Sequence, residues 1–334
     1  MPRISFEKMF EEFHRVLLKA GFAPERAELC ARIFAENMRD GVYSHGLLRF
    51  PGFVANARSG KNFDMHAQIE QVGSFGVLEQ WDGHLGPGMV NATACMERAL
   101  ELARQHGMGC VALKNNNHWM RAGTYALQAA AAGFIGMCWT NTIKLMPPWG
   151  SGEKRLGNNP LAVGVPRAGG HVLLDMAMTQ YSGGKTMIYS RNKEQFPLPG
   201  GYDNEGELSC DPDAVQESGR PLPIGYWKGS GLAFVLDMVA ALLAGGRSTA
   251  QLSRQGDEYG VSQIFIAIDV KGVAGEQGVQ ETVEDIVGYL HEAAPLEEGG
   301  AVTYPGEGML KTRRENLEQG IPVDAEMWQG LLDM

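Results

Sequence analysis

The sequence predicts an α/β fold for the middle of the chain, on two observations. Short apolar runs alternate there with longer stretches of helical periodicity, an order typical of strands and helices that build a sheet. Composition agrees, because 44% of the 334 residues are hydrophobic and 20% are charged, as in globular chains with one large or two medium cores. The alternating segments are 76–81, 89–105, 109–114, 123–132 and 134–140.

The first 60 residues are predicted to form a helical cap before this alternation begins. Residues 5–20 are amphipathic, and their apolar stripe consists of Phe6, Phe10, Phe13 and Leu17. A second helix is expected over 24–40, because Pro24 favours a helix start and Gly41 follows its end.

The second half of the chain contains further strands and helices, separated by one irregular stretch. The expected strands are 161–165, 172–176 and 264–270, and the expected helices are 230–244, 279–291 and 311–319. A turn at 166–170 joins the first two of these strands. Residues 181–223 are rich in Gly, Pro, Asp and Ser without clear periodicity, so an irregular functional or mobile segment is expected there.

Charge and cysteine content exclude several classes of protein. The formal net charge is -10 and no dense Lys/Arg run exists, which argues against a nucleic acid partner. Five cysteines without a C-x-x-C pair indicate neither a disulfide framework nor a thiolate zinc site, so a cytoplasmic protein is expected. The polar N-terminus is no signal peptide. The longest apolar run, 232–244, is short and interrupted by Asp237, so no membrane span is expected.

The segment 43–50 contains the residue pair that points most directly to chemistry. If this segment is helical, His45 and Arg49 share one face, because residues four apart are neighbours on a helix. Arg49 then binds a carboxylate with two hydrogen bonds, and His45 exchanges a proton at an adjacent carbonyl or hydroxyl. A small oxo or hydroxy acid fits this pair. The alternative is a capping serine, a surface histidine and a solvated arginine.

Two glycine-containing segments are candidate sites for phosphate groups. Gly86-Pro87-Gly88 is interpreted as a tight turn, because Asn91 occupies the third glycine position of the dinucleotide fingerprint and no acid follows the next strand. No Rossmann domain is therefore predicted. Residues 227–231 open an apolar helix, whose free N–H groups and Lys228 favour an anion. A simple helix cap with a solvated lysine remains the alternative.

Polar clusters also follow three predicted strands, where ligand sites of α/β proteins gather. His118 lies in the first cluster, 115–119, although asparagines and a histidine beside a tryptophan also suit a packed turn. Lys144 follows Thr140-Asn141-Thr142-Ile143 and is either a substrate clamp or a solvated charge. Asp175 ends a strand, where it orients a histidine, binds a ribose hydroxyl or caps a turn.

Taken together, these clusters resemble the malate/L-lactate dehydrogenase family, which also contains sulfolactate, ureidoglycolate and piperideine-carboxylate oxidoreductases. The resemblance covers nearly the whole chain. Its motifs are Ser44-His45-Gly46 with Arg49, Asn115 to His118, Gly157-Asn158-Asn159-Pro160-Leu161, Asp175-Met176-Ala177, Pro197-Leu198-Pro199 through Asp211-Pro212, Tyr226 to Gly231, Pro305-Gly306-Glu307-Gly308 and Gly320-Ile321-Pro322-Val323-Asp324.

The resemblance implies a non-Rossmann, sulfolactate dehydrogenase-like fold, with a mixed sheet, flanking helices and helical caps. It implies a helical cap with the histidine segment at 1–72, a nucleotide-binding core at 73–275 and a C-terminal segment at 276–334 that packs on the cap. A homodimer with NADH as cofactor, or NADPH as the alternative, is expected. The implied cofactor contacts are His171, Val172, Leu173, Leu174, Asp175, Met176, Ala177, Trp227, Lys228, Gly306, Glu307 and Gly308.

The family also suggests roles for the remaining candidates. By resemblance, His45 donates the proton and Ser44 and Arg49 hold the substrate, a small anionic keto or hydroxy acid. Several segments look most like the branch that reduces a 2-keto sugar acid: 41–46, 117–121, 138–141, 146–150 and 225–231. In the ureidoglycolate branch, the histidine matching His118 is the acid/base and a lysine matches Lys144.

Alternatives to the sugar-acid reductase stay open at this stage. Lys144 stands where the sugar-acid branch carries alanine, which favours a dehydrogenase of a malate, lactate or ureidoglycolate type. A hydro-lyase or epimerase could use the same His, Asp and Arg residues without redox chemistry. A non-catalytic protein that binds a sugar acid is a third class, which the intact acid/base residues argue against.

Overall fold

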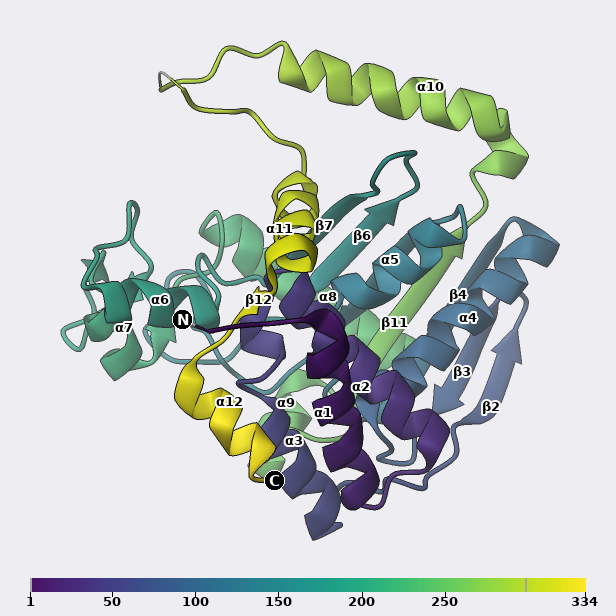
Figure 1. Ribbon diagram of the computed structural model, residues 1–334, viewed down its shortest axis with the longest axis horizontal. Helices are drawn as coiled ribbons and strands as arrows, with labels where there is room; N and C mark the ends of the chain where they lie inside the picture. The colour runs from purple at the N-terminus through teal and green to yellow at the C-terminus, as the bar shows by residue number, and fades with distance from the viewer. Residues whose placement is uncertain (1, 298) are drawn as a thin grey trace.

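The computed structural model describes residues 2–297 and 299–334, and its centre is a seven-stranded sheet (Figure 1). The strand order is β2-β3-β4-β11-β5-β6-β7. Within the described residues β3 and β4 run parallel and the other neighbours pair antiparallel, so the sheet is mixed. The strands are β2 (Glu70–Phe75), β3 (Leu78–Asp82), β4 (Met108–Asn116), β5 (Ile135–Thr140), β6 (Leu161–Val165), β7 (Val172–Met176) and β11 (Val261–Ile268).

Both faces of this sheet are covered, as the alternation of side chains along β4 shows. Val111 and Leu113 point to the face covered by α4 (Gly88–His106) and α5 (Gly123–Ala131). Cys110 and Ala112 point to the opposite face, where α8 (Trp227–Ala244) packs. The predicted α/β class with a mixed sheet and flanking helices is therefore confirmed.

The N-terminal helices form a separate aromatic core beside the sheet. α1 (Phe6–Lys19), α2 (Pro24–Arg39) and α3 (Phe50–Ser59) bury a cluster that includes Phe13, Phe34 and Phe50. The ring centroids of Phe13 and Phe50 lie 4.5 Å apart. The two predicted helices are confirmed. α3 was not expected, because Pro51 and Gly52 lie in its first turn and its ten residues lack a clear apolar stripe.

The C-terminal segment returns to this cap. β1 (Arg3–Ile4) pairs with β12 (Ile321–Pro322), and α12 (Ala325–Leu332) lies beside α1 (Figure 1). α11 (Glu307–Gln319) packs against α2 through Asn316, whose side-chain amide donates to the carbonyls of Met38 and Arg39. Residues far apart in the chain thus build one unit around the segment that follows α2.

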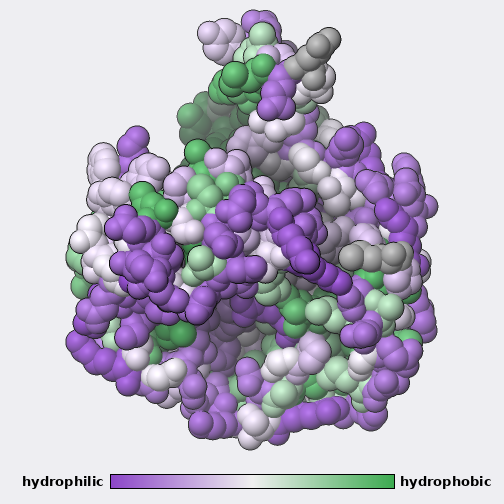
Figure 2. Space-filling view, turned by 90° about the vertical axis from the view of Figure 1, so that its left-hand side faces the viewer, coloured by the Kyte–Doolittle hydropathy of each residue, from purple (hydrophilic) through white to green (hydrophobic). Residues whose placement is uncertain are grey.

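Residues 181–223 are more ordered than the sequence suggested. They contain α6 (Gly183–Asn192), α7 (Pro212–Ser218) and a small sheet of β8 (Gly201–Tyr202), β9 (Leu208–Ser209) and β10 (Arg220–Pro221). Tyr181 stacks on Phe196 with ring centroids 4.2 Å apart, which gives this lobe its own packing. The expectation of an irregular stretch was wrong, because two-residue strands leave no periodicity to detect. Figure 2 shows mostly hydrophilic residues on this side of the molecule.

Three differences concern the remaining elements. α10 (Lys271–His291) starts earlier than expected and contains a kink at Gly275, whose φ is 70°. It lies apart from the body in Figure 1 and is tied to the β6–β7 turn by the Arg167–Glu284 ion pair. β2 and α9 (Thr249–Gln255) were not predicted. The 3₁₀ turn η1 (Tyr43–His45) stands where a continuous helix was considered.

α8 is long and apolar enough, by length and composition, to cross a bilayer, and no other helix among the described residues is. In the structure its buried residues Ala233, Leu236 and Ala240 pack on the sheet. Its Asp237 accepts hydrogen bonds from the Asn141 side chain and the Thr249 N–H, both at 2.8 Å. The opposite face of the helix exposes large apolar side chains, and only 28% of the helix is buried.

Candidate active site

His45 and His118, the two candidate acid/base residues, lie side by side. Their ring centroids are 5.9 Å apart and the planes are inclined by 18°. The helical geometry considered for 43–50 was wrong: His45 ends η1, Gly46 has φ -116° and ψ -121°, and α3 starts only at Phe50. The His45 and Arg49 side chains nevertheless face one site, since the Arg49 charge acts on both histidines.

The backbone around His45 is held by contacts with α2. The Asn37 side-chain amide donates to the His45 carbonyl at 2.9 Å, and a Cβ added to Gly46 would come within 2.2 Å of the Met38 sulfur. This close approach explains why a glycine follows the histidine. The Ser44 hydroxyl lies 3.0 Å from His45 Nδ1, so it fixes the ring while Nε2 faces away from this contact.

His118 is held by a more rigid support. Trp119 is 1% exposed and stacks on Tyr125, whose hydroxyl donates to the Trp119 carbonyl at 2.6 Å. The Asn117 amide donates to the Leu85 carbonyl at 2.7 Å. The Met120 N–H donates to His118 Nδ1 at 3.0 Å, so the neutral ring carries its proton on Nε2.

The glycine-containing segment 83–88 also supports the loop that carries His118. The Gly86 N–H donates to the Gly83 carbonyl at 2.8 Å, so the tight turn spans 83–86 rather than the predicted 86–88, and Gly88 begins α4. A Cβ added to Gly88 would lie 2.3 Å from the Asn117 carbonyl oxygen and 2.4 Å from that of His118. Gly88 therefore allows the start of α4 to approach the loop that carries His118.

Both histidines are poor proton acceptors in the free protein. Burial, followed by the charge of Arg49, lowers the pKa of His45 to about 4, although the carboxylate of Asp175 acts in the opposite direction. Burial and the charges of Arg49 and His45 hold the pKa of His118 well below its usual range.

A cavity of about 270 Å³ opens beside these histidines. It is lined by Leu48, Arg49, Gly52, Phe53, Asn56, Phe63, Asn117, His118, Met120 and Glu258. Arg49 is exposed, and its guanidinium makes no hydrogen bond to a described residue, so it is available to an anion. A second cavity of about 320 Å³, around Asp82 and Arg247, contains none of the candidate catalytic residues, and we place the site in the first.

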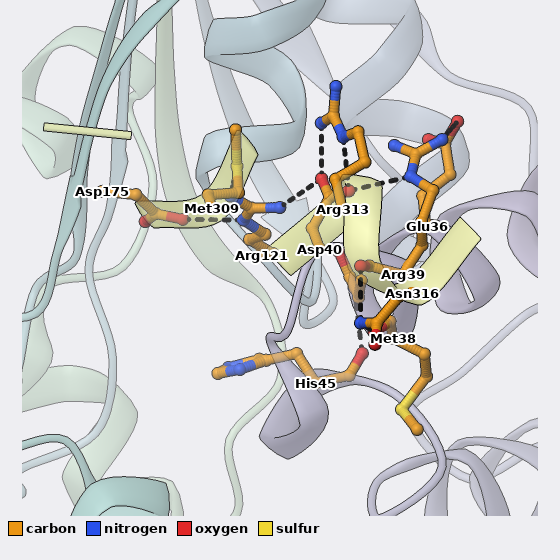
Figure 3. A network of polar contacts seen from close by, with 11 residues as sticks. Glu36, Met38, Arg39, Asp40, His45, Arg121, Asp175, Met309, Arg313 and Asn316 are labelled. Carbon is orange, nitrogen blue, oxygen red and sulfur yellow. Dashed lines mark hydrogen bonds and ion pairs between the residues drawn. The ribbon is translucent and has the colours of Figure 1, made fainter. Parts of the chain in front are cut away.

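Asp175 belongs to a network of charged residues behind His45 (Figure 3). Arg121 Nε donates to Asp175 Oδ2, and Arg121 Nη1 donates to Asp40 Oδ2, each at 3.0 Å. Arg313 also binds Asp40, at 2.8 and 2.7 Å. Burial alone would raise the pKa of Asp40, but hydrogen bonds from Arg313 and Arg39 bring this pKa below its ordinary value. The network joins α2, β7 and α11.

Asp40 and Arg121 were missed as functional candidates by sequence reasoning. They lie 81 positions apart, so no local spacing relates them. The available signal was a charged residue two positions after the cluster 115–119. The structure shows that this arginine is only 6% exposed, and an arginine so buried requires acidic partners.

Two of the three expected cofactor segments meet at the start of β7, which is an edge strand of the sheet. The Leu173 N–H donates to the Pro305 carbonyl at 2.8 Å. A Cβ added to Gly306 would lie 2.9 Å from the Leu173 nitrogen, and Gly306 has φ 97°, so only glycine suits this position. Residues 171–177 and 306–308 are thus brought together.

The third expected cofactor segment, at the start of α8, adjoins the other end of β7. The Ile224 N–H donates to the Met178 carbonyl at 2.8 Å, shortly before Trp227 and Lys228 begin the helix. Tyr226 precedes them with φ 60°, and its ring lies 4.9 Å from that of Trp149. Trp227 is 66% exposed. The segment is adjacent to β7 and open to a ligand.

Lys144 lies near the cavity but outside its lining. Its side chain is exposed and its backbone N–H donates to the Ser253 hydroxyl at 2.9 Å. The preceding Ile143 N–H donates to Glu258, which does line the cavity. Glu258 was not a candidate in the sequence, because a single glutamate in the polar loop between α9 and β11 carries no distinguishing pattern.

Comparisons with known proteins agree with this architecture. A family model described as malate/L-lactate dehydrogenase matches residues 4–332. A 2,3-diketo-L-gulonate reductase of Citrobacter koseri is 43% identical over 327 residues, covering 98% of each chain, and one of Escherichia coli K12 is 42% identical over the same coverage.

Solved structures match over the whole chain as well. Sulfolactate dehydrogenase from Methanocaldococcus jannaschii aligns with a TM-score of 0.88 at 29% identity, covering 99% of this chain and 96% of that one. Malate dehydrogenase from Entamoeba histolytica, at 24% identity and the same coverage, shares the fold with a TM-score of 0.93. The chain therefore belongs to the malate/L-lactate dehydrogenase family of oxidoreductases.

Proposed function

We propose that this protein reduces 2,3-diketo-L-gulonate to 3-dehydro-L-gulonate with a nicotinamide dinucleotide as hydride donor. The names of its relatives support the substrate. The observation that carries the proposal is the convergence of His45, His118 and Arg49 beside one cavity, where the Arg49 guanidinium forms no ion pair with a described residue. An anionic keto acid needs a cation for its carboxylate and a proton donor for its carbonyl oxygen, and both are present.

The residues around β7 fit a nicotinamide dinucleotide. As an edge strand, β7 offers backbone groups that no neighbouring strand pairs with. Gly306 lets its segment approach the backbone of Leu173 closely. His171 to Ala177, Gly306 to Gly308, Trp227 and Lys228 are the proposed contacts. The bound nicotinamide supplies the hydride. NADH is the proposed form, as the sequence suggested.

The protein residues supply orientation and the proton. Arg49 binds the substrate carboxylate with two hydrogen bonds, which fixes the keto carbon relative to the cofactor. His118 donates a hydrogen bond from Nε2, because its Nδ1 already accepts one from Met120. His45 transfers a proton to the alkoxide oxygen that forms as the hydride arrives, and Ser44 holds its ring. Asp175 stabilises the protonated form of His45.

The low pKa of free His45 gives the substrate a second role. Arg49 lowers this pKa, so a carboxylate that pairs with Arg49 removes part of its effect and makes His45 easier to protonate. Substrate binding then loads the proton that the reaction consumes. A neutral acid without this charge would leave His45 deprotonated.

The test is the loss of NADH absorbance with 2,3-diketo-L-gulonate, beside pyruvate, oxaloacetate and oxamate-type ureido acids. A large preference for diketogulonate is expected. Parallel assays with NADPH decide the cofactor. Activity confined to another keto acid would replace the substrate and keep the class, whereas no activity with any of them would refute the proposal.

A dehydrogenase of a malate, lactate or ureidoglycolate type is the second candidate. The position of Lys144 favours it, because its neighbour Ile143 contacts a residue of the cavity wall. Preference for a small hydroxy acid in the same assay, lost on Lys144→Ala, would select this candidate.

We also propose a cytoplasmic homodimer that buries the exposed face of α8. Phe234, Met238 and Leu242 recur at helical spacing and are 54%, 46% and 72% exposed. Leu242→Glu should produce a monomer in light scattering, while Val273→Glu on α10 should not. A wild-type monomer would refute this assembly.

A further inference from the structure

The wall of the cavity also contains a carboxyl group without a defined role. Glu258 lies in the loop between α9 and β11 and lines the cavity together with Arg49 and His118. Its Oε2 accepts a hydrogen bond from the Ile143 N–H at 3.3 Å. Its Oε1 makes no hydrogen bond to any residue that the structure describes, so one oxygen is available to a ligand.

The surroundings of Glu258 differ from those of the other acids near the site. Asp40 and Asp175 bind arginines directly, whereas no arginine or lysine in the described chain forms an ion pair with Glu258. Burial raises the pKa of Glu258, against weaker effects of the Ile143 N–H and Arg49. A carboxyl oxygen without a protein partner accepts a hydrogen bond from a substrate hydroxyl in its ionised form, and the protonated form can also donate one.

Two other polar residues of the cavity, Asn117 and Arg49, are less suited to a hydroxyl. The Asn117 amide already donates to the carbonyls of Leu85, Asn62 and Gly86. Arg49 is needed for the carboxylate, and the remaining wall includes the apolar Leu48, Phe53, Phe63 and Met120.

We propose that Glu258 is a specificity-determining residue that binds a hydroxyl group of the substrate chain while Arg49 binds its carboxylate. This inference rests on the proposed function and names the feature by which polyhydroxylated acids are distinguished from small keto acids. A keto acid without hydroxyl groups forms no such hydrogen bond with Glu258, so it gains no affinity from this residue.

The experiment measures binding to the full protein with saturating NADH by titration calorimetry, with L-gulonate as the polyhydroxylated probe and oxamate as the probe without hydroxyl groups. Glu258→Ala should weaken L-gulonate binding about three- to tenfold, the range for one hydrogen bond, and leave oxamate binding unchanged. Glu258→Gln, whose amide also donates, should retain binding within about twofold. Asp257→Asn, at an exposed neighbour that pairs with Lys61, is the matched control and should change neither probe.

Equal losses for both probes would show a structural role and overturn the inference, as would unchanged L-gulonate binding in Glu258→Ala. Turnover of 2,3-diketo-L-gulonate distinguishes a wrong role for Glu258 from a wrong proposed function. Wild-type reduction of 2,3-diketo-L-gulonate with no selective effect of Glu258→Ala refutes the role of Glu258 alone. A selective loss of L-gulonate binding without any wild-type turnover of diketogulonate refutes the proposed substrate and keeps Glu258 as a hydroxyl-binding residue.

Discussion

The two histidines of the site lie 5.9 Å apart but are supported in opposite ways. His118 follows a strand and is fixed by buried Trp119 and by the hydrogen bond from Met120 to its Nδ1. His45 ends a single 3₁₀ turn and is surrounded by charges, since Arg49, Asp175 and Arg121 all act on its pKa. This difference in support agrees with the proposed roles, in which His118 is a fixed hydrogen-bond donor and His45 changes its protonation state.

The largest expected effect comes from replacing each of the two histidines in turn. His45→Ala should lower kcat about 100- to 10,000-fold, the usual contribution of general acid catalysis, with little change in NADH affinity. His118→Gln keeps a donor and should lose only about tenfold. Steady-state kinetics and fluorescence titration with NADH measure both. If the two losses were reversed, His118 would be the acid and the comparison would be wrong.

A second prediction concerns the charge that both histidines sense. Arg49→Lys should raise KM for the keto acid about tenfold or more and change kcat less, because an ammonium cannot form the two parallel hydrogen bonds of a guanidinium. Arg58→Lys, on the exposed last turn of α3, is the matched control. An unchanged KM would show that the carboxylate binds elsewhere.

Proton uptake provides a sharper test of the difference between the histidines. Binding of an anionic acid beside Arg49 should draw a proton from solution at pH 6 to 7, because it raises the low pKa of His45. Calorimetry with oxamate in buffers of different ionisation enthalpy measures this uptake. His45→Gln should abolish it and His118→Gln should not. Equal uptake in the His45 variant would assign the proton to another group.

The smallest expected effect is on stability. The folded state holds both histidines neutral, so the unfolded chain binds more protons below its imidazole pKa of about 6.5. The free energy of unfolding should therefore fall as pH decreases from 7 to 5. His45→Gln should reduce this loss by on the order of 1 kcal/mol, after allowance for the half-buried ring. Urea unfolding at both pH values is the measurement, and an identical pH dependence would contradict it.

Sequence reasoning succeeded where local pattern determines structure. The amphipathic helices of the cap and the strands around 109–114 and 172–176 were predicted because their periodicity or apolar runs are long enough to detect. It failed for 181–223, where strands of two residues exist only through their partners. It also failed at Gly46, whose backbone depends on the close packing of Met38.

The same limit applies to the site. His45, Arg49 and His118 were recognised from short motifs, whereas Glu258 reaches the cavity only because β11 pairs between β4 and β5. Asp40 and Arg121 meet through the packing of α2 against α4 and the loop after β4. The fold brings these residues together from distant parts of the chain, so no regular spacing in the sequence predicts their contacts.

The attachment of α11 to the end of α2 has a consequence for the order in which the enzyme is made. Asn316 and Arg313 complete the hydrogen bonds of Met38, Arg39 and Asp40, just before the segment that carries His45. During synthesis residues 38–45 emerge from the ribosome long before α11 exists. The segment before the proposed acid is therefore completed only after α11 has been translated, and we expect it to be more sensitive to proteolysis in a chain that ends before α11.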